Sequence, residues 1–461
     1  MEQDSSTNMW NILIHKDTTE LMDLSFNCIC GKTHTIPIKY LSIKNGAVSE
    51  TGRKMEQYKV KGQGVLVYDN KIKEQVVRGV YDNLAQQGLQ LTLYGVGNNQ
   101  EEIIPEAAFS EHIARDLRNG PDYLVSVGSG VISDITKYAA CILGLPYMLI
   151  ATAPSMNGYA SSMAALQERG IKKTLTVPPA VMVFADIDLL KQSPVQMVLA
   201  GLGDIVSKSV CSADWKLSNL VKGTYFCSLP FRMTDKTEPR YLGAAEEISR
   251  RTDRGIGILT DGIMRSGLSM TVIGESTPSS GAEHLLSHYW DLLSLVEGKK
   301  KFLHGTQVGV ATLLILKLYN FLREVPIRKV VSMEQLRKNY PEKQDLEELL
   351  SAKFGGFAPA VKTEYFQKYL DWEHKRSEIE FIIENWNSIW AELESFIRPW
   401  EPVEEALKKS GAPVYPHHLN KSNDEIIDSL ASAPLIRGRY NILDLAGDLN
   451  LTTKAAAKIL G

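Results

Sequence analysis

The sequence predicts an α/β domain followed by an all-helical domain. From Gly62 to about residue 194, short apolar runs alternate with helical patterns, which indicates a parallel sheet with helices on both faces. After Pro194 long helical patterns dominate. We therefore expect three regions: an N-terminal extension over residues 1–60, an α/β domain over 61–194 and a helical domain over 195–461.

The composition is that of an ordinary globular protein. The 461 residues carry a net charge of -3, which gives no electrostatic reason to expect nucleic acid or an anionic membrane as a partner. Five irregularly spaced cysteines argue against a disulfide framework, and the N-terminus lacks the pattern of a secretory signal. The longest apolar run, Val308 to Leu316, is too short to span a bilayer. We expect a cytoplasmic protein without membrane insertion.

The N-terminal extension contains Cys28-x-Cys30 and His34 at close spacing. These residue types could form part of a metal knuckle. Because no second group of Cys and His residues is near in the sequence, a small β-hairpin with buried thiols is the favoured interpretation.

The α/β region reads as a series of strands and helices. Strands are expected at 65–68, 89–94, 123–127, 147–150, 175–177 and 181–184, and helices at 72–87, 109–119 and 132–143.

Two segments of this region are candidates for ligand binding. The third strand leads into Gly128-Ser129-Gly130 and a helix, where glycines let the backbone approach a pyrophosphate at the helix N-terminus. The form GSGxxxD departs from GxGxxG, and an ordinary tight turn fits equally well. The fourth strand ends in a polar loop, ATAPSMNGYASS at 151–162, which includes Thr152, Ser155 and Asn157. Open α/β sheets bind ligands at this edge.

The helical half has patterns at 196–217, 244–267, 283–296, 305–321, 342–354, 366–396, 403–409 and 424–430. In the first of them Asp204 lies in an apolar segment, where an acid is costly unless it is paired or binds metal. It could bind a metal ion or pair with Lys208 on the same helix face.

Three of the nine histidines lie between residues 279 and 309. His284 and His288 share a helix face, and His304 follows a short charged loop. Imidazole is the commonest protein ligand of divalent metals, and two such ligands with a carboxylate would form an open three-ligand site. The histidines could instead cap helices or fill a core.

Five segments in this order resemble one family. They are GSGxxxD (128–134), ATAPSMNGYAS (151–161), GLGDIVSK (201–208), SSGAEHLLSH (279–288) and FLHGTQVG (302–309), followed by RGRYNILDLAGDL (437–449). Together they resemble the iron-containing alcohol dehydrogenase and dehydroquinate synthase-like superfamily, and within it the sn-glycerol-1-phosphate dehydrogenases of the AraM-like branch. The resemblance covers roughly residues 60–455.

The resemblance implies a Rossmann-like N-terminal domain, a helical domain and an active site in the cleft between them. It implies metal ligands at Asp204, His284 and His304, and a non-ligand histidine near the substrate at His288. Cofactor-binding positions would be Asp69, Gly128, Ser129, Gly130, Asp134, Thr152 and Ser155. Relatives usually have Asp where this chain has Asn157, and Asn keeps a hydrogen bond but loses the charge and any base function.

The implied reaction is the interconversion of dihydroxyacetone phosphate and sn-glycerol 1-phosphate by NAD(H) or NADP(H), with one divalent ion (zinc, nickel or iron) polarising the carbonyl. A homodimer or larger homo-oligomer is also implied. The alternatives are a polyol or glycerol dehydrogenase, a dehydroquinate-synthase-like enzyme, and a non-catalytic relative.

Overall fold

The computed structural model describes residue 10 and residues 12–98, 103–168 and 171–460. Residues 1–9, on which the expectation about a secretory signal largely rests, lie outside the described part. Contacts within the chain define two compact units. Unit 1 comprises Met1–Ile205, Ser228–Ser276 and Lys409–Ala412, and unit 2 comprises Val206–Cys227, Thr277–Lys408 and Pro413–Gly461. Each unit is therefore built from separate stretches of sequence.

Unit 1 contains a six-stranded sheet in the order β3-β10-β7-β6-β4-β5, and every pairing in it is parallel. The strands are β3 (Tyr40–Lys44), β4 (Gln63–Asp69), β5 (Gln90–Val96), β6 (Tyr123–Gly128), β7 (Tyr147–Ala151) and β10 (Met182–Asp186). The central strands β6, β7 and β10 are buried along their whole length, as expected for a parallel sheet covered on both faces. The predicted α/β fold is confirmed.

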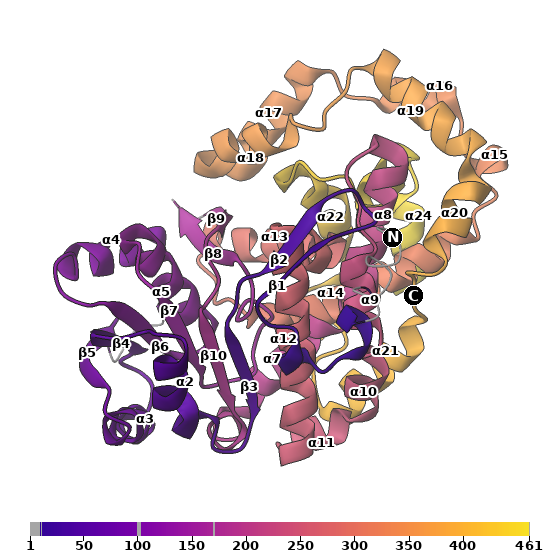
Figure 1. Cartoon of the computed structure of the whole chain (residues 1–461). Coiled ribbons are helices and arrows are strands. Elements are labelled where there is room, and N and C mark those ends of the chain that lie inside the picture. The colour runs from indigo at the N-terminus through magenta and orange to yellow at the C-terminus, as the bar shows by residue number, and fades with distance from the viewer. Residues whose placement is uncertain (1–9, 11, 99–102, 169–170, 461) are drawn as a thin grey trace. The chain divides into compact units, whose positions relative to one another are not determined.

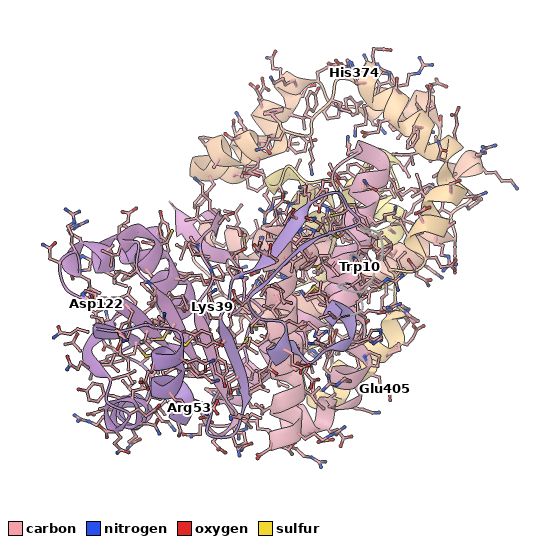
Figure 2. All side chains as sticks on the ribbon, in the orientation of Figure 1. Trp10, Lys39, Arg53, Asp122, His374 and Glu405 are labelled. Atoms are coloured by element: carbon pink, nitrogen blue, oxygen red, sulfur yellow. The ribbon has the colours of Figure 1, made fainter. Side chains whose placement is uncertain are left out.

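Helices cover both faces of this sheet (Figure 1). The helices α2 (Thr51–Gln57) and α3 (Glu74–Gln86) lie on one face, and α4 (Ala107–Asp116) and α5 (Gly130–Leu143) lie on the other. On the α3 side, Val77, Val80 and Leu84 recur at helical spacing and pack against Leu66 and Val125 of the sheet. Asp122, labelled in Figure 2, lies just before β6. Its carboxylate accepts a hydrogen bond from the backbone N–H of Gln63 at 2.8 Å.

Two parts of unit 1 differ from the expected strand series. The edge strand β3 belongs to the segment 1–60, which we expected to be a separate extension, and it pairs with β10. Residues 175–177, expected to continue the parallel series, instead contribute to β9 (Ile171–Thr176), which pairs antiparallel with β8 (Met163–Glu168) in a separate sheet. A short apolar run fits either kind of sheet, so periodicity alone does not choose its partner.

The remaining described elements of unit 1 are the N-terminal hairpin, one long helix and several short helices. They are β1 (Leu24–Asn27), β2 (Thr33–Ile36), η1 (Thr18–Glu20), η2 (Ala47–Glu50), α6 (Ile187–Leu190), α7 (Val195–Ile205), α9 (Leu229–Asp235), α10 (Glu238–Gly243), α11 (Ala245–Ser249) and α12 (Asp253–Ile273). The strands β1 and β2 form the predicted hairpin.

Unit 2 is helical in the part that the structure describes. Its elements are α8 (Lys208–Lys222), η3 (Thr277–Ser279), α13 (Ala282–Val296), α14 (His304–Arg323), α15 (Ile327–Val330), α16 (Met333–Asn339), α17 (Lys343–Phe354), η4 (Gly355–Phe357), α18 (Ala358–Tyr365), α19 (Trp372–Glu384), α20 (Trp386–Leu393), α21 (Trp400–Ser410), η5 (Pro416–Leu419), α22 (Asn423–Ser432), η6 (Ala433–Ile436), α23 (Ile442–Asp448) and α24 (Thr452–Leu460). The start of α19 is capped by Asp371, whose carboxylate accepts the backbone N–H of His374 at 3.0 Å. His374 is labelled in Figure 2.

Two predicted helices are each divided in the structure. The pattern at 196–217 becomes α7 and α8, which fall in different units. The pattern at 244–267 becomes α11 and α12, because Arg251 takes a positive φ of 56° and the Thr252 hydroxyl caps α12 at the N–H of Gly255. As a result, α7 and α9 to α12 belong to unit 1, whereas we had expected a domain boundary at residue 194.

The helix α14 is the single helix among the described residues that is long and apolar enough to cross a membrane, with a hydropathy of 1.2. In that window 78% of the residues are buried within the protein, a pattern that core helices also show.

Candidate active site

The carboxyl edge of the sheet in unit 1 has a topological switch point between β4 and β6. From β4 the chain runs outward to β5, and from β6 it runs the other way to β7. Open α/β sheets bind ligands at such a point. Asp69 ends β4 and Gly128 ends β6, so two of the predicted cofactor residues flank the switch point. The Asp69 carboxylate accepts the backbone N–H of Lys71 at 2.8 Å and remains half-buried.

The turn Gly128-Ser129-Gly130 connects β6 directly to α5. A Cβ atom at Gly128 would lie 2.7 Å from the Cβ of Ile132, so this turn leaves no space for a side chain. Gly130 begins α5, a helix of 14 residues, whose first backbone N–H groups have no partner within the helix. A helix N-terminus at a switch point fits the pyrophosphate of a dinucleotide.

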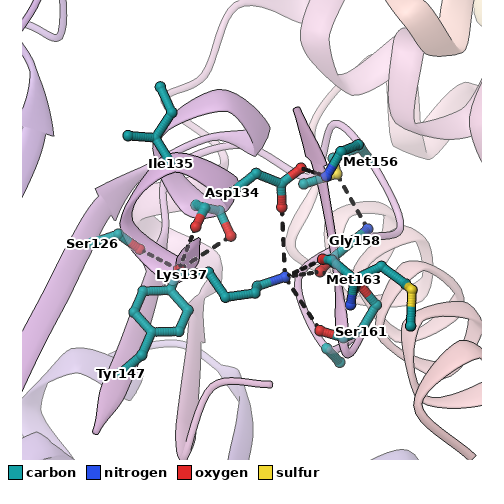
Figure 3. A network of polar contacts seen from close by, with 12 residues as sticks. Ser126, Asp134, Ile135, Lys137, Tyr147, Met156, Gly158, Ser161 and Met163 are labelled. Atoms are coloured by element: carbon teal, nitrogen blue, oxygen red, sulfur yellow. Dashed lines mark hydrogen bonds and ion pairs between the residues drawn. The ribbon is translucent and has the colours of Figure 1, made fainter. Parts of the chain in front are cut away.

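Asp134 and Lys137 form a buried polar network behind this turn (Figure 3). The ammonium group of Lys137 donates to the carbonyl oxygens of Gly158, Ser161 and Met163 at 2.9, 3.2 and 2.8 Å, and it lies 3.5 Å from the Asp134 carboxylate. The second carboxylate oxygen of Asp134 accepts the N–H of Ala165. The Asp134 side chain is thus engaged with the segment 158–165, and its assignment to the cofactor stays a prediction.

Lys137 was not among the predicted residues, although its position three residues after Asp134 places the two on one helix face. Burial lowers the pKa of Lys137, and the nearby Asp134 carboxylate opposes that shift. Three carbonyl acceptors and one carboxylate suit the charged ammonium form. Lys137 therefore fixes the loop that carries Asn157.

The loop after β7 is also held by its own hydrogen bonds. The N–H of Thr152 donates to the carbonyl oxygen of Gly128 at 3.1 Å, which places the predicted residue Thr152 beside the glycine turn. The Tyr159 hydroxyl donates to the carbonyl oxygen of Ala153 at 2.6 Å and lies 3.1 Å from the Ser155 hydroxyl. Thr152, Ser155 and the glycine turn therefore share the carboxyl edge of the sheet.

Asn157 and Asp204 are joined within unit 1. The backbone N–H of Asn157 donates to Oδ2 of Asp204 at 2.8 Å, and both side chains are buried. Among the described residues, the Nδ2 atom of Asn157 has no hydrogen-bond partner. This amide can therefore donate to a bound ligand.

The three predicted histidines are brought together in unit 2. The helix α13 carries His284 and His288, and α14 begins at His304. The ring centroids of His284 and His304 are 5.1 Å apart, those of His288 and His304 are 5.5 Å apart, and those of His284 and His288 are 6.3 Å apart. The Ser287 hydroxyl lies 3.0 Å from Nδ1 of His304.

Glu283 orients His284. Its Oε1 atom lies 2.5 Å from Nδ1 of His284 and also accepts the N–H of Gly281 and the thiol of Cys211, each at 3.0 Å. Burial opposes ionisation of Glu283, but the hydrogen bond and charge of His284 lower its pKa below the ordinary value. With an ionised carboxylate as acceptor, Nδ1 of His284 carries the proton, so Nε2 is the ring nitrogen whose lone pair can bind a metal ion. Sequence reasoning missed Glu283, although a carboxylate directly before a candidate ligand in an apolar helix is a visible signal.

A second buried acid, Asp214 on α8, lies behind this cluster. It accepts the hydroxyl of Tyr319 at 2.6 Å and the backbone N–H groups of Ala282 and Ile442 at 2.7 and 2.9 Å. Burial and the neighbouring charge of Glu283 raise the pKa of Asp214 to about 7. Asp214 holds the first turn of α13, and so it helps to position His284.

His288 differs from the other two histidines. Its Nδ1 atom lies 3.4 Å from the guanidinium of Arg437, which can only donate. In the neutral ring the proton is therefore on Nε2 of His288. Arg437 is partly buried; burial lowers the pKa of its guanidinium, and the charge of Glu364 opposes that shift. The cation beside His288 suits an anionic group on a ligand.

A cavity of about 240 Å³ in unit 2 is separate from these residues. It is lined by aromatic side chains such as Tyr340 and Trp372 and by two ion pairs, Lys368 with Asp444 and Lys375 with Asp448. None of the three histidines lines it.

Comparison with known proteins decides the family. Residues 42–194 match the family model described as iron-containing alcohol dehydrogenase. A glycerol-1-phosphate dehydrogenase [NAD(P)+] of Geobacillus thermodenitrificans is 31% identical over 300 residues, which cover 65% of this chain and 74% of the relative. The chain belongs to the iron-containing alcohol dehydrogenase family. It is an NAD(P)-dependent oxidoreductase of the alcohol dehydrogenase type, which confirms the family resemblance and the predicted class of enzyme.

Other relatives agree. A glycerol-1-phosphate dehydrogenase [NAD(P)+] of Geobacillus stearothermophilus is 28% identical over 361 residues, covering 74% of this chain and 89% of the relative. Among solved structures, a probable glycerol dehydrogenase from Sinorhizobium meliloti 1021 matches with a TM-score of 0.57 at 16% identity, over 91% of this chain and 97% of that one. The structural match supports the iron-containing alcohol dehydrogenase fold.

Proposed function

We propose that this enzyme interconverts dihydroxyacetone phosphate and sn-glycerol 1-phosphate with NADH or NADPH at one divalent metal ion. The observation that carries the proposal is the histidine cluster of unit 2, with Glu283 behind His284. Curated relatives that align over most of their length are named glycerol-1-phosphate dehydrogenases, which supports this substrate. When bound, the metal ion polarises the carbonyl and the nicotinamide carries the hydride.

We assign Asp204, His284 and His304 as the metal ligands. The two histidines are within reach of one ion, since a donor nitrogen of each lies within 4.8 Å of the other's. Asp204 stands two residues before Val206, where unit 2 begins, and α8 then packs against α13 of the same unit. Chain connectivity therefore supports Asp204 as the carboxylate ligand. A set of two histidines and one carboxylate suits zinc, nickel or iron.

The nucleotide is assigned to the carboxyl edge of the sheet in unit 1. Its pyrophosphate would lie at Gly128-Ser129-Gly130 and the N-terminus of α5, with Thr152 and Ser155 beside it. Asp69 at the end of β4 would accept a hydroxyl of the adenosine half. Asp134 would support this edge through its contacts with Lys137 and Ala165.

His288 and Asn157 are assigned to the substrate. Because Nδ1 of His288 accepts from Arg437, its Nε2–H can give a proton to the substrate oxygen, a contribution of typically about 10²–10⁴-fold in rate. Asn157 lacks the charge of an acid and would act as a hydrogen-bond donor through its buried Nδ2 atom. Proton transfer is thus assigned to His288 alone.

Arg437 is assigned to the substrate phosphate. Its guanidinium lies beside His288, and planar guanidinium groups bind phosphate with two parallel hydrogen bonds. A phosphorylated substrate would bring an anion to this cation, which otherwise has the charge of Glu364 in its surroundings, whereas glycerol would bring none. The predictions of a homo-oligomer and of a cytoplasmic location stay predictions.

The test compares dihydroxyacetone phosphate with unphosphorylated dihydroxyacetone as oxidants of NADH and NADPH. We expect turnover with the phosphate ester, and in reverse with sn-glycerol 1-phosphate but not with its enantiomer. His284→Ala should lose bound metal and turnover together. If the purified enzyme reduced the unphosphorylated ketone as efficiently, or if His284→Ala retained its metal, the proposal would be wrong.

The variant Arg437→Met tests whether this residue binds the substrate phosphate, and a control variant shows whether loss of any arginine would have the same effect. We expect KM for dihydroxyacetone phosphate to rise about 10-fold or more, because a charge-assisted pair contributes about 1.5–3 kcal/mol. Arg376→Met is the matched control, since Arg376 is exposed on α19 and pairs with Glu380. An unchanged KM in Arg437→Met would show that Arg437 does not bind the substrate phosphate.

A further inference from the structure

The thiol of Cys211 is a buried group of unit 2 to which the proposed mechanism gives no role. Cys211 lies on α8, and its side chain is buried. Within unit 2, α8 packs against α13, the helix that carries His284 and His288. The thiol therefore belongs to a helix that supports the histidine cluster.

The Cys211 thiol donates a hydrogen bond to Glu283. Its sulfur atom lies 3.0 Å from Oε1 of Glu283 and 3.7 Å from the hydroxyl oxygen of Ser207. The ionised carboxylate is both the nearer and the stronger acceptor. The same Oε1 atom accepts the N–H of Gly281 and lies 2.5 Å from Nδ1 of His284. A thiol, a backbone amide and an imidazole thus meet at one carboxylate oxygen.

These contacts hold Glu283 through one of its two carboxylate oxygens. Among the described residues, Oε2 of Glu283 has no hydrogen-bond partner. Of the three groups at Oε1, those of Gly281 and His284 belong to the chain next to Glu283, and the thiol of Cys211 comes from another helix. The contact with Cys211 therefore joins the orientation of Glu283 to α8.

The space around Glu283 is closely filled at Gly281. A Cβ atom at Gly281 would lie 2.7 Å from a carboxylate oxygen of Asp214 and from Oε2 of Glu283, and 3.1 Å from Cα of Cys211. The backbone of α8 thus approaches the start of α13 without space for a methyl group. Because of this close approach, a change of the side chain at residue 211 acts directly on the Glu283 carboxylate.

The proton of this hydrogen bond stays on the sulfur atom. Burial raises the pKa of the Cys211 thiol well above its ordinary value, and the charge of Glu283 raises it further. The charge of Lys208 opposes these two effects. Since thiolates rather than thiols are metal ligands, the neutral thiol acts as a hydrogen-bond donor.

We propose that Cys211 is a positioning residue of the metal site, and that its thiol holds Glu283 in the orientation that keeps the proton of His284 on Nδ1. This role rests on the proposed function, because it takes His284 as a metal ligand. Without the thiol the Glu283 carboxylate can turn, and the Nε2 lone pair of His284 loses its alignment. Such partners typically change metal affinity about 10–100-fold, and a weak S–H donor acting through Glu283 should lie near the lower end of that range.

Direct binding of the metal ion by Cys211 is the competing interpretation. One donor atom from each of Cys211, Glu283 and His284 lies within 4.8 Å of the others, and thiolates are good ligands for zinc. In that arrangement Cys211 would have to lose its proton and its hydrogen bond to Glu283. A thiolate-to-metal absorption in the cobalt-loaded protein that disappears in Cys211→Ser would show that Cys211 is a ligand, and the positioning role would be wrong.

The first test measures the rate at which the full-length protein loses its metal ion to a chelator. Cys211→Ala should lose the ion about 10-fold faster than the wild type, whereas Cys211→Ser should be close to the wild type, because a hydroxyl also donates to the carboxylate. Alanine and serine differ by that hydroxyl, so the comparison separates the hydrogen bond from the change in volume. Cys141→Ala is the control, because Cys141 is exposed on α5. If Cys211→Ala lost the ion no faster than Cys211→Ser, Cys211 would have no positioning role.

The second test measures the hydrogen bond itself by infrared spectroscopy of the thiol. The S–H stretching band that is present in the wild type and absent from Cys211→Ser belongs to Cys211. This band should lie at higher frequency in Glu283→Gln, because a neutral amide is a weaker acceptor than a carboxylate. The same frequency in the wild type and in Glu283→Gln would overturn the contact on which the positioning role depends.

The metal measurements also separate this inference from the proposed function. His284→Ala tests the metal site itself, whereas Cys211→Ala tests the support of Glu283. Loss of metal from His284→Ala together with full retention by Cys211→Ala would overturn the role of Cys211 alone. Retention of metal by both variants would overturn the proposed metal site, and the role of Cys211 with it.

Discussion

In unit 1 the proposed nucleotide-binding edge is formed mainly by backbone groups, whereas in unit 2 the histidine cluster is formed by side chains from two helices. The glycine turn offers N–H groups at the start of α5, and Lys137 fixes the adjoining loop through three backbone carbonyls. The histidine cluster depends on Glu283 and Ser287, which hold the Nδ1 atoms of His284 and His304. A backbone site should be sensitive to added volume and loop movement, and a side-chain site to the loss of single partners.

The largest expected effect concerns the loop that Lys137 holds. Lys137→Met would leave three buried carbonyl oxygens and the Asp134 carboxylate without their cation. Breaking a buried pair of this kind typically costs about 3–5 kcal/mol. We expect a clear fall in the thermal midpoint and a raised KM for NADH, measured by calorimetry and initial rates. Lys61→Met, at an exposed position, should change neither.

The glycine turn should respond to a single methyl group. In Gly128→Ala the new Cβ would lie 2.7 Å from the Cβ of Ile132, so the turn must shift. A displacement near 1 Å can cost about 10²-fold, and here it should appear as weaker nucleotide binding with metal content unchanged. Gly79→Ala is the control, since a Cβ there meets open space. Normal nucleotide affinity in Gly128→Ala would contradict the placement of the pyrophosphate.

A substitution in the histidine cluster should weaken metal binding and leave nucleotide binding unchanged, the reverse of the effect expected at Gly128. Glu283→Gln keeps the shape but replaces the ionised acceptor of the His284 proton. Loss of such a partner typically lowers metal affinity or activity about 10–100-fold. We expect weaker metal retention against a chelator, with nucleotide binding preserved. Glu297→Gln, at the exposed end of α13, serves as the control. Equal metal retention in both variants would show that Glu283 does not support metal binding.

The smallest effect concerns Asp214 and pH. Its pKa of about 7 lies above the unfolded value near 3.9, so the folded state binds more protons between these values. The contribution of Asp214 to the free energy of unfolding is therefore fully present below about pH 4 and is lost as the pH rises towards about 7. The loss is at most roughly 1.4 kcal/mol per pH unit. The thermal midpoint of the wild type should fall more between pH 5 and 7 than that of Asp214→Asn. Parallel curves would show that Asp214 is ionised throughout.

Features that depend on residues close together in the sequence could be predicted from it. The strand-to-helix turn at Gly128 and the histidines four residues apart, His284 and His288, could be recognised by spacing, and the structure brings His304 to them. Asp204 stood out because an acid in an apolar helix is costly. The parallel sheet followed from the alternation of elements.

The features that were missed depend on contacts between distant segments. The strand β3 was hidden in the N-terminal segment because its five residues carry only a weak pattern, and its partner β10 follows much later. Lys137 reads as a surface lysine until the carbonyl groups of another loop surround it.

The discontinuity of the two units has a consequence for synthesis. The last stretch of unit 1, Lys409–Ala412, is made only after most of unit 2, and unit 2 itself begins inside unit 1 at Val206. At a typical rate of about 5–20 residues per second, residue 412 appears on the order of 20–80 s after the start. Neither unit can therefore complete its folding on the ribosome before the other has begun, and fragments cut at either boundary would lack part of a core.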